Sequence, residues 1–168
     1  MPFSLIPDLV FDRYSDITPA MLTRHGIKLL LCDLDYTLAP RSVAIPGETL
    51  HRWLDEMNAA GITVMILSNN RSGERVNMFC KDLGIHYVGH ARKPSRRGYR
   101  EAIKEAGVTA AQTAMLGDKL LTDVLGAKRS GILALMVEPL GGPIGAWNHV
   151  LHLLQRPFKF ISKRRFQK

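Results

Sequence analysis

The sequence predicts an α/β fold in which a parallel sheet is covered by helices on both faces. Helical and strand-like segments alternate along the chain, and the strand-like segments are almost continuously apolar. A glycine followed by isoleucine or valine also recurs, at positions 26, 61, 84, 107 and 131. Glycine takes the left-handed conformation that often ends a helix, and a branched residue then starts the next strand. Each pair therefore marks a step from helix to strand, with right-handed crossovers between parallel strands.

The elements can be placed along the chain from these marks. About five strands are expected, over residues 28–32, 62–67, 85–88, 113–116 and 132–137. Three helices are indicated by apolar residues with helical spacing: Leu50, Trp53, Leu54, Met57; Val76, Phe79, Cys80, Leu83; and Tyr99, Ala102, Ile103, Ala106. Ser72 and Ser95 are candidate N-caps. A further amphipathic helix is expected over residues 146–154.

The chain has the length and composition of one globular domain with additions at both ends. It has 168 residues, 46% of them hydrophobic, and a mean hydropathy near zero. We expect an N-terminal segment at residues 1–27, a core domain at 28–155 and a basic aromatic tail at 156–168. The N-terminal segment holds an apolar cluster that either packs on the core or meets lipid. Thr18 and Pro19 are expected to open a short helix there.

Charge and cysteine content limit the compartment and the partners. Cys32 and Cys80 lie in apolar segments and give no disulfide framework, which favours a reducing cytoplasm. Cys32 is expected to be a small core residue rather than a nucleophile. No basic region precedes an apolar run at the N-terminus, so no signal peptide is expected. The net charge of +8 indicates an anionic partner, which can be a phosphate compound, nucleic acid or a lipid surface.

Two carboxylates at the end of the first core strand are the strongest functional signal. Asp33 and Asp35 follow four apolar residues, and alternation along an extended chain places both on the same side. Two converging negative charges are costly unless a cation or a reacting group is expected there. The carboxyl ends of parallel strands are where open α/β sheets bind their ligands. An acidic turn after a strand is the plainer alternative.

Other polar residues follow the remaining predicted strands. Strand 62–67 runs into Ser68 and Asn69, strand 113–116 runs into a segment with two aspartates, and Lys93 lies in the loop after strand 85–88. In a parallel sheet these strand ends share one edge. The residues expected to meet there are Asp33, Asp35, Ser68, Lys93, Asp118 and Asp123. Oxygen ligands of this kind suit a hard cation such as Mg²⁺.

These residues carry a resemblance to a known family. Asp33-Leu34-Asp35-Tyr36-Thr37, Ser68, Lys93 and Gly117-Asp118…Asp123 are similar to the four motifs of the haloacid dehalogenase-like (HAD) phosphohydrolases, in order, over about residues 28–137. The layout of the whole chain resembles the YqeG family of class IIIA HAD phosphatases, which is related to the phosphatidylglycerophosphate phosphatases of mitochondria and chloroplasts. This implies a three-layer Rossmann-like HAD fold. Tyr36 departs from the small or amide residue usual at its position, which leaves substrate choice less defined than reaction class.

The resemblance also implies a role for each site residue. Asp33 would attack phosphorus and form an aspartyl-phosphate, and Asp35 would act as general acid and then general base. Lys93 would neutralise the charge of the transition state, and Thr37, Ser68 and Asn69 would bind the substrate. Mg²⁺ would be held by the Asp33 side chain, the Asp35 backbone carbonyl and Asp118, with Asp123 nearby or bound through water. Taken singly, Ser68 is equally a turn residue, Lys93 a solvated charge and Asp123 a helix N-terminal residue.

The spacing between motifs bears on the substrate. Residues 37–68 and 70–93 leave no room for a cap domain, so an open site and a large or membrane-presented phosphomonoester are expected. The tail has six basic residues and no acid, which indicates either a solvated basic C-terminus or contact with an anionic membrane. In the second case a cytoplasmic protein would lie at the inner face of the membrane. Phosphatidylglycerophosphate is the candidate that the resemblance supplies. Soluble sugar phosphates or nucleotides, a phospho-acceptor module like a receiver domain, and nucleic acid (for which no motif is present) are the alternatives.

Overall fold

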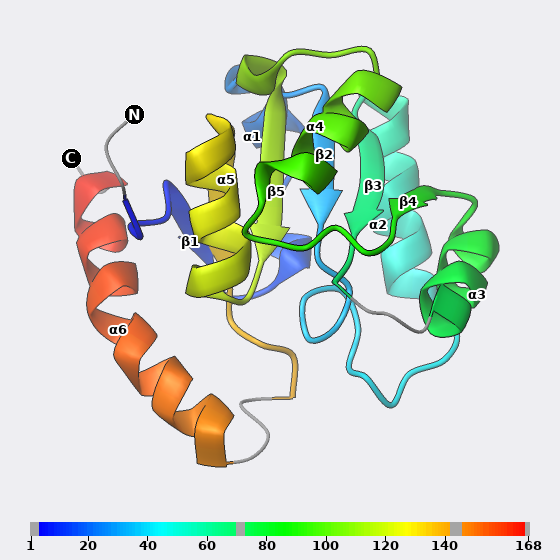
Figure 1. Cartoon of the computed structure of the whole chain (residues 1–168). Coiled ribbons are helices and arrows are strands. Elements are labelled where there is room, and N and C mark those ends of the chain that lie inside the picture. The colour runs from blue at the N-terminus through cyan, green and yellow to red at the C-terminus, as the bar shows by residue number, and fades with distance from the viewer. Residues whose placement is uncertain (1–3, 70–72, 142–145, 167–168) are drawn as a thin grey trace.

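The centre of the molecule is a six-stranded parallel sheet with the strand order β1-β6-β5-β2-β3-β4 (Figure 1). The computed structural model describes residues 4–69, 73–141 and 146–166. The strands are β1 (Leu9–Phe11), β2 (Leu29–Cys32), β3 (Thr63–Leu67), β4 (His86–Val88), β5 (Thr113–Gly117) and β6 (Leu133–Val137). The helices are α1 (Pro19–Arg24), α2 (Glu48–Ala59), α3 (Gly73–Leu83), α4 (Arg96–Glu105), α5 (Leu125–Ser130) and α6 (Ala146–Phe166). The α/β class and the parallel sheet predicted from the sequence are confirmed.

Side chains of the central strand β2 alternate between two apolar layers. Leu30 and Cys32 pack with residues of α1, α2 and α3 on one face, and Leu29 and Leu31 pack with residues of α4 and α5 on the other. All four side chains are fully buried, which explains the unbroken apolar run in the sequence. Cys32 is therefore a core residue, and burial raises the pKa of its thiol.

The N-terminal segment adds a strand that the sequence did not predict. Strand β1 pairs with β6, with Leu9 opposite Leu135, and so extends the expected five strands to six. Asp8 fixes this edge: its backbone N–H donates to the Ala134 carbonyl at 2.8 Å, and its carboxylate accepts from the Ala134 N–H at 2.8 Å. Lys128 forms an ion pair with the same carboxylate. The apolar cluster of this segment thus packs on the core, one of the two alternatives.

Several predicted helix boundaries agree with the structure. Gly131 ends α5 with φ of 71°, and the four other glycines of the recurring pairs also have positive φ. Thr18 caps α1 by accepting a hydrogen bond from the Met21 N–H, and Ser95 caps α4 by accepting from the Arg97 N–H. Ser72 lies outside the described residues.

Helix α6 is longer than the predicted helix and runs through Phe166 along the β1 edge of the sheet (Figure 1). The Ser162 hydroxyl donates to the Asp8 carbonyl at 3.4 Å, and Phe158 packs partly against the core. Pro157 lies within the helix. Among the described residues, no helix combines the length and the apolar character needed to cross a membrane.

Close packing between α4 and α5 gives a test of this architecture. A Cβ atom at Gly126 would lie 2.7 Å from Tyr99 Cζ, in a part of the core where both residues are buried. We expect Gly126→Ala to lower the free energy of unfolding by about 1–3 kcal/mol, because overpacking outweighs the helix propensity of alanine. Urea unfolding measures this. Gly73→Ala is the control, since a Cβ there meets no atom within 4 Å, and equal stabilities of the two variants would contradict the packing.

Candidate active site

The predicted site residues gather where β2, β3 and β5 end at one edge of the sheet (Figure 1). The chain leaves β2 for β3 on one side and later returns to β5 on the other, so this edge is a topological switch point. A cavity of about 510 Å³ opens there. It is lined by Asp33, Asp35, Arg41, Ser68, Asn69, Lys93, Lys119 and Thr122.

Three buried aspartates lie close together at this edge of the sheet, and one of them, Asp33, lines the cavity. Carboxylate oxygens of Asp33, Asp118 and Asp123 lie within 4.8 Å of one another, and the three residues are 8%, 7% and 1% exposed. Lys93 Nζ lies 2.7 Å from Asp33 Oδ1 and 2.8 Å from Asp123 Oδ1. Lys119 Nζ lies 2.9 Å from Asp118 Oδ1 and 3.6 Å from Asp33 Oδ2. Two ammonium groups therefore offset part of the concentrated negative charge.

The ionisation of these groups follows from burial and from their neighbours. Burial alone would raise the pKa of Asp33, but Lys93 and Lys119 outweigh it and hold that pKa below its ordinary value. Burial, reinforced by the other carboxylates, raises the pKa of Asp118 to about 6 and also raises that of Asp123. The pKa of Lys93 is raised by Asp123 and Asp33 although burial opposes this. Asp33 and Lys93 are consequently both charged near neutral pH.

The segment after β5 places Asp123 beneath the cavity. Residues Leu120–Val124 form a π-helical turn, and the Asp123 carboxylate accepts a hydrogen bond from the Lys119 N–H at 3.2 Å. A Cβ atom at Gly117 would overlap the Asp123 side chain, so only glycine fits at the end of β5. The buried Tyr99 hydroxyl donates to the carbonyl of Asp123 at 3.3 Å. The turn, Gly117 and Tyr99 together fix the carboxylate.

Asn69 and Ser68 connect the end of β3 to the loop that carries Lys93. The Asn69 side chain accepts from the Lys93 N–H at 2.7 Å and donates to the Lys93 carbonyl at 3.0 Å. The Ser68 backbone N–H donates to Val88 at 3.0 Å, and its carbonyl accepts from Ala91 at 3.0 Å. Asn69, expected to bind substrate, thus lines the cavity and also clamps the Lys93 backbone. Ser68 is 5% exposed and lines the cavity as well.

The Asp35 carboxylate lies between two arginines that the sequence analysis did not identify. Arg75, from the first turn of α3, pairs with Asp35 Oδ1 and donates to the carbonyls of Pro40 and Val43, each at 2.9 Å. Arg41 Nε lies 3.3 Å from Asp35 Oδ2. Arg75 therefore fastens the loop after β2 to α3. No spacing pattern in the sequence identifies these arginines as site residues, because each acts through a loop contact. The signal that could have found them is their position just after two of the motifs.

Thr37 and Tyr36 lie differently from the residues that line the cavity. Thr37 is fully buried, and its hydroxyl donates to Asp118 Oδ1 at 3.4 Å, so it supports the aspartate cluster and does not line the cavity. Tyr36 has a φ of 68°, and its backbone N–H and carbonyl bond to Ala39 and Leu140, each at 2.8 Å. Its strained backbone belongs to the tight turn that carries Asp35.

The donor set fits a hard divalent cation. Asp33, Asp118 and Asp123 offer only oxygen atoms. A cation among them would offset the burial and the mutual repulsion that together raise the pKa of Asp118. The Asp35 side chain, in contrast, is engaged by Arg75 and Arg41. Cysteine and histidine take no part in this cluster of described residues, which disfavours a soft metal.

Comparison with known proteins identifies the class. Residues 20–131 match the family of haloacid dehalogenase-like hydrolases, which is two thirds of the chain. The chain belongs to this family. Its fold is also that of the cobalt-bound deoxy-D-mannose-octulosonate 8-phosphate phosphatase of Haemophilus influenzae, with a TM-score of 0.57 and 20% identity over 86% of this chain and 98% of that one. A subfamily IIIA hydrolase from Legionella pneumophila has a TM-score of 0.53 and 21% identity, covering 86% of this chain and 93% of that chain.

Sequence relatives narrow the assignment. The chain is 34% identical over 160 residues to the probable phosphatase YqeG of Bacillus subtilis, which covers 95% of this chain and 92% of that protein. With this identity and coverage it is a member of the YqeG family, as its motifs indicated. It is also 29% identical over 149 residues to phosphatidylglycerophosphate phosphatase 1 of Arabidopsis thaliana, covering 83% of this chain and 41% of the plant protein.

Because Asp118 is buried among other carboxylates, we predict that replacing it with a neutral residue stabilises the folded protein in the absence of a cation. We expect Asp118→Asn to raise the Tm of EDTA-treated protein by about 5 °C at about pH 7.5, because the charged Asp118 is disfavoured in the fold. The folded pKa of about 6 lies above the ordinary value of 3.8, so the folded state binds more protons between these values. The wild type therefore loses stability as pH rises through this window. The advantage of the variant should shrink toward zero near about pH 4.

Thermal unfolding with added Mg²⁺ completes this test. The wild type should gain stability on Mg²⁺ addition and Asp118→Asn should gain less, because the variant has lost one anionic ligand. Asp55→Asn, an exposed position on α2, is the control and should behave as the wild type. A variant less stable than the wild type in EDTA at about pH 7.5 would show that the carboxylate is favourable without a cation.

Proposed function

We propose that this HAD-type phosphatase is a Mg²⁺-dependent phosphomonoester hydrolase that acts through an aspartyl-phosphate on Asp33. The observation that carries the proposal is the pairing of Asp33 with Lys93 Nζ at 2.7 Å inside a cavity that Asp35 and Ser68 also line. The pKa of Asp33 is held low, so the residue is an anionic nucleophile near neutral pH. A charged ammonium beside it favours the approach of an anionic phosphoryl group.

In the first step, an oxygen of Asp33 forms a bond to phosphorus as the bond from phosphorus to the ester oxygen breaks. Asp35 donates its proton to the departing oxygen, which leaves as a neutral alcohol. Lys93 stabilises the charge on the phosphoryl oxygens, and Ser68, which lines the same cavity, would donate its hydroxyl to one of them. Asp35 lines the same cavity as Asp33, so the acid and the nucleophile can act on one phosphoryl group.

In the second step, Asp35 accepts a proton from water as the water oxygen attacks the phosphorus of the aspartyl-phosphate. Inorganic phosphate leaves and the Asp33 carboxylate is restored. Mg²⁺ would be held by Asp33, Asp118 and Asp123 with the Asp35 backbone carbonyl, and it would neutralise charge between nucleophile and phosphate. Thr37 supports Asp118, and Asn69 holds Lys93 in place through its backbone.

Removal of the nucleophile tests the reaction. Asp33→Asn should lower Mg²⁺-dependent phosphate release from p-nitrophenyl phosphate by at least about 10³-fold, because an amide does not form the covalent intermediate. Circular dichroism should show an intact fold, since the side chain ends at a cavity and not in the core. Asp55→Asn is the matched control. Undiminished turnover by Asp33→Asn would remove Asp33 from its role.

The site is open, and this supports a large or membrane-presented substrate. Between Thr37 and Ser68 the chain forms one loop, α2 and β3, and between Asn69 and Lys93 the described elements are α3 and β4. No additional domain covers the cavity among the described residues. A bulky alcohol can therefore extend out of the cavity while its phosphate reaches Asp33.

The outward face of α6 supports contact with a membrane. Gln155, Lys159 and Ser162 are buried against the rest of the molecule. Exposed apolar side chains lie on the other side of the helix: Val150, Leu153, Leu154, Phe160 and Ile161, each at least 41% exposed. A helix that turns polar residues inward and apolar residues outward is suited to an interface with lipid.

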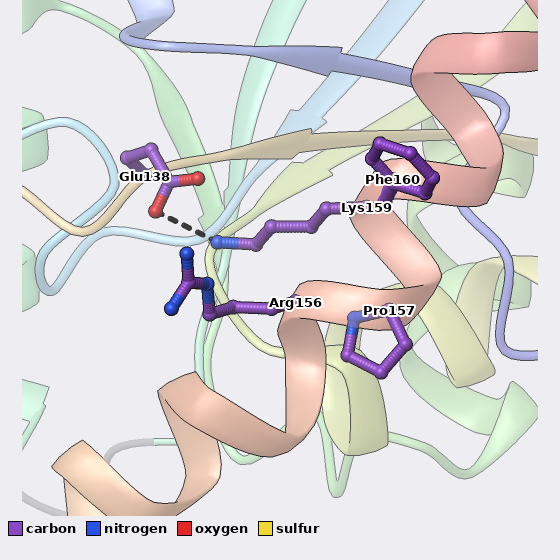
Figure 2. Close-up of a pocket in the computed structure, with 5 residues that line it drawn as sticks. All are labelled: Glu138, Arg156, Pro157, Lys159 and Phe160. Atoms are coloured by element: carbon purple, nitrogen blue, oxygen red, sulfur yellow. Dashed lines mark hydrogen bonds and ion pairs between the residues drawn. The ribbon is translucent and has the colours of Figure 1, made fainter.

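The contacts at a pocket beside α6 distinguish the basic side chains that are used within the molecule from those that can meet an anionic surface. Figure 2 shows Arg156 and Lys159 directed toward Glu138, with Pro157 and Phe160 beside them, around a pocket of about 420 Å³. Lys159 Nζ lies 2.8 Å from a Glu138 carboxylate oxygen and is 7% exposed. Lys159 is thus used inside the molecule, whereas Arg156 is exposed. Among the basic side chains of the tail that the structure describes, Arg156 is the one that can contribute a charge to membrane contact.

These features favour a lipid phosphomonoester, with phosphatidylglycerophosphate as the candidate suggested by the relatives in plants and algae. We expect phosphate release from this lipid in anionic vesicles, and much slower release from soluble sugar phosphates and nucleotides. Leu153→Glu should lower turnover of the vesicle-borne lipid at least about fivefold, because it places a charge on the apolar face of α6. Turnover of p-nitrophenyl phosphate should not change.

Met78→Glu is the matched control for the α6 variant, because it adds the same charge at an exposed apolar position on α3. It should leave both reactions as in the wild type. Fast turnover of a soluble phosphomonoester, with none of the lipid, would assign the enzyme to soluble metabolites. Equal loss with Leu153→Glu and Met78→Glu would remove α6 from lipid contact.

A further inference from the structure

We propose that Arg41 forms a second anion-binding subsite, which selects phosphomonoesters whose alcohol carries another negative group near the ester oxygen. This rests on the proposed function, since it takes Asp33 as nucleophile and Asp35 as general acid. The group recognised is a phosphodiester or a carboxylate. It belongs either to a lipid headgroup or to a soluble metabolite.

The position of Arg41 in the cavity indicates what it can touch. Lys93, Ser68 and Asp33 define the end where the phosphoryl group is attacked. Asp35 must approach the ester oxygen to protonate it, so the alcohol portion of the substrate extends on the Asp35 side. Arg41 lines the cavity on that side, with its Nε 3.3 Å from Asp35 Oδ2. A volume of about 510 Å³ leaves room for more than a phosphoryl group.

The two arginines beside Asp35 differ in their contacts. Arg75 holds the loop in place, whereas Arg41 is available to bind a ligand. The Arg75 side chain is 19% exposed and is held by the carbonyls of Pro40 and Val43 as well as by Asp35. The Arg41 side chain is 64% exposed, and in the part of the chain that the structure describes its ion pair is with Asp35 alone. Arg41 can turn to a ligand without releasing the loop, whereas Arg75 cannot.

The charges beside Asp35 leave room for an anion of the substrate. Two guanidinium groups share the one Asp35 carboxylate, so this group of three side chains carries one positive charge more than it offsets. Arg75 has two carbonyl acceptors besides Asp35, whereas the more exposed Arg41 can turn to another acceptor. A guanidinium binds phosphodiester or carboxylate oxygens through two N–H groups.

The experiment compares matched pairs of substrates that differ in the second anion. The lipid pair is phosphatidylglycerophosphate, which has a phosphodiester, and phosphatidic acid, which has none, in the same mixed micelles. The soluble pair is 3-phosphoglycerate, which has a carboxylate, and glycerol 3-phosphate, which has none. Within each pair the leaving group is an alkyl alcohol, so loss of general acid catalysis alone affects both members alike. The two pairs distinguish a lipid source from a soluble one.

The wild type should prefer the member with the second anion in at least one pair. Arg41→Gln should reduce that preference, measured as the ratio of kcat/KM values, by about tenfold or more. Arg41→Lys should retain an intermediate preference, because lysine keeps the positive charge but lacks the two parallel N–H donors of a guanidinium. Arg52→Gln on α2, which pairs with Glu48 and lies outside the cavity, should behave as the wild type.

An unchanged preference in Arg41→Gln, with turnover of both members intact or equally lowered, would overturn the subsite. A wild type without preference in either pair would also overturn it. Failure of the proposed function has a different signature. In that case the wild type releases no phosphate from any of the four compounds, or Asp33→Asn releases it undiminished.

Discussion

The rest of the structure depends on one constraint, which is the repulsion among three buried carboxylates. Lys93 offsets part of this repulsion. Carboxylate oxygens of Asp33, Asp118 and Asp123 lie within 4.8 Å of one another, and the buried side chain of Lys93 pairs with Asp33 and Asp123. This concentration of charge persists because the chain fixes each member from outside the cluster. Asn69 clamps the lysine through its backbone, and Gly117 leaves room for Asp123. In the proposed function, a cation and a phosphoryl group would offset the stability that the crowded carboxylates cost at this edge.

The sequence was informative about this edge because two regular patterns coincide there. Apolar runs identify buried parallel strands, and parallel strands bring their carboxyl ends together, so Asp33, Ser68 and Asp118 could be placed without knowing any contact. Strand β1 was missed, since three half-buried residues show no alternation or flanking turn signal. Arg75 and Arg41 were missed for a related reason. Their partners are a loop carbonyl and a carboxylate 6 to 40 residues away, and no periodicity encodes such contacts.

In helix α6, the tertiary contacts change the role that the charge pattern of the sequence predicts. From the sequence, Lys159 is one of several basic residues in a tail suited to an acidic surface. In the structure its ammonium group is buried against Glu138, and the exposed side of the helix is mainly apolar. Polar residues face inward because α6 lies along the β1 edge, where backbone and carboxylate groups need partners, as Ser162 and Asp8 show. The exposed apolar side chains on its other side are then available to another surface.

Among the residues that the structure describes, no second domain covers the cavity, so the selectivity of this site has to come from the residues at its rim. In this molecule the rim is the loop after β2, which Arg75 holds to α3 through two carbonyl groups. That attachment gives Asp35 a fixed position and leaves Arg41 as the more exposed charge beside it. The same loop therefore holds two arginines with different surroundings. Arg75 holds the loop in place, and in our proposal Arg41 contacts the alcohol portion of the substrate. Substrate choice would then change through one exposed side chain while the buried carboxylates and Lys93 remain as they are.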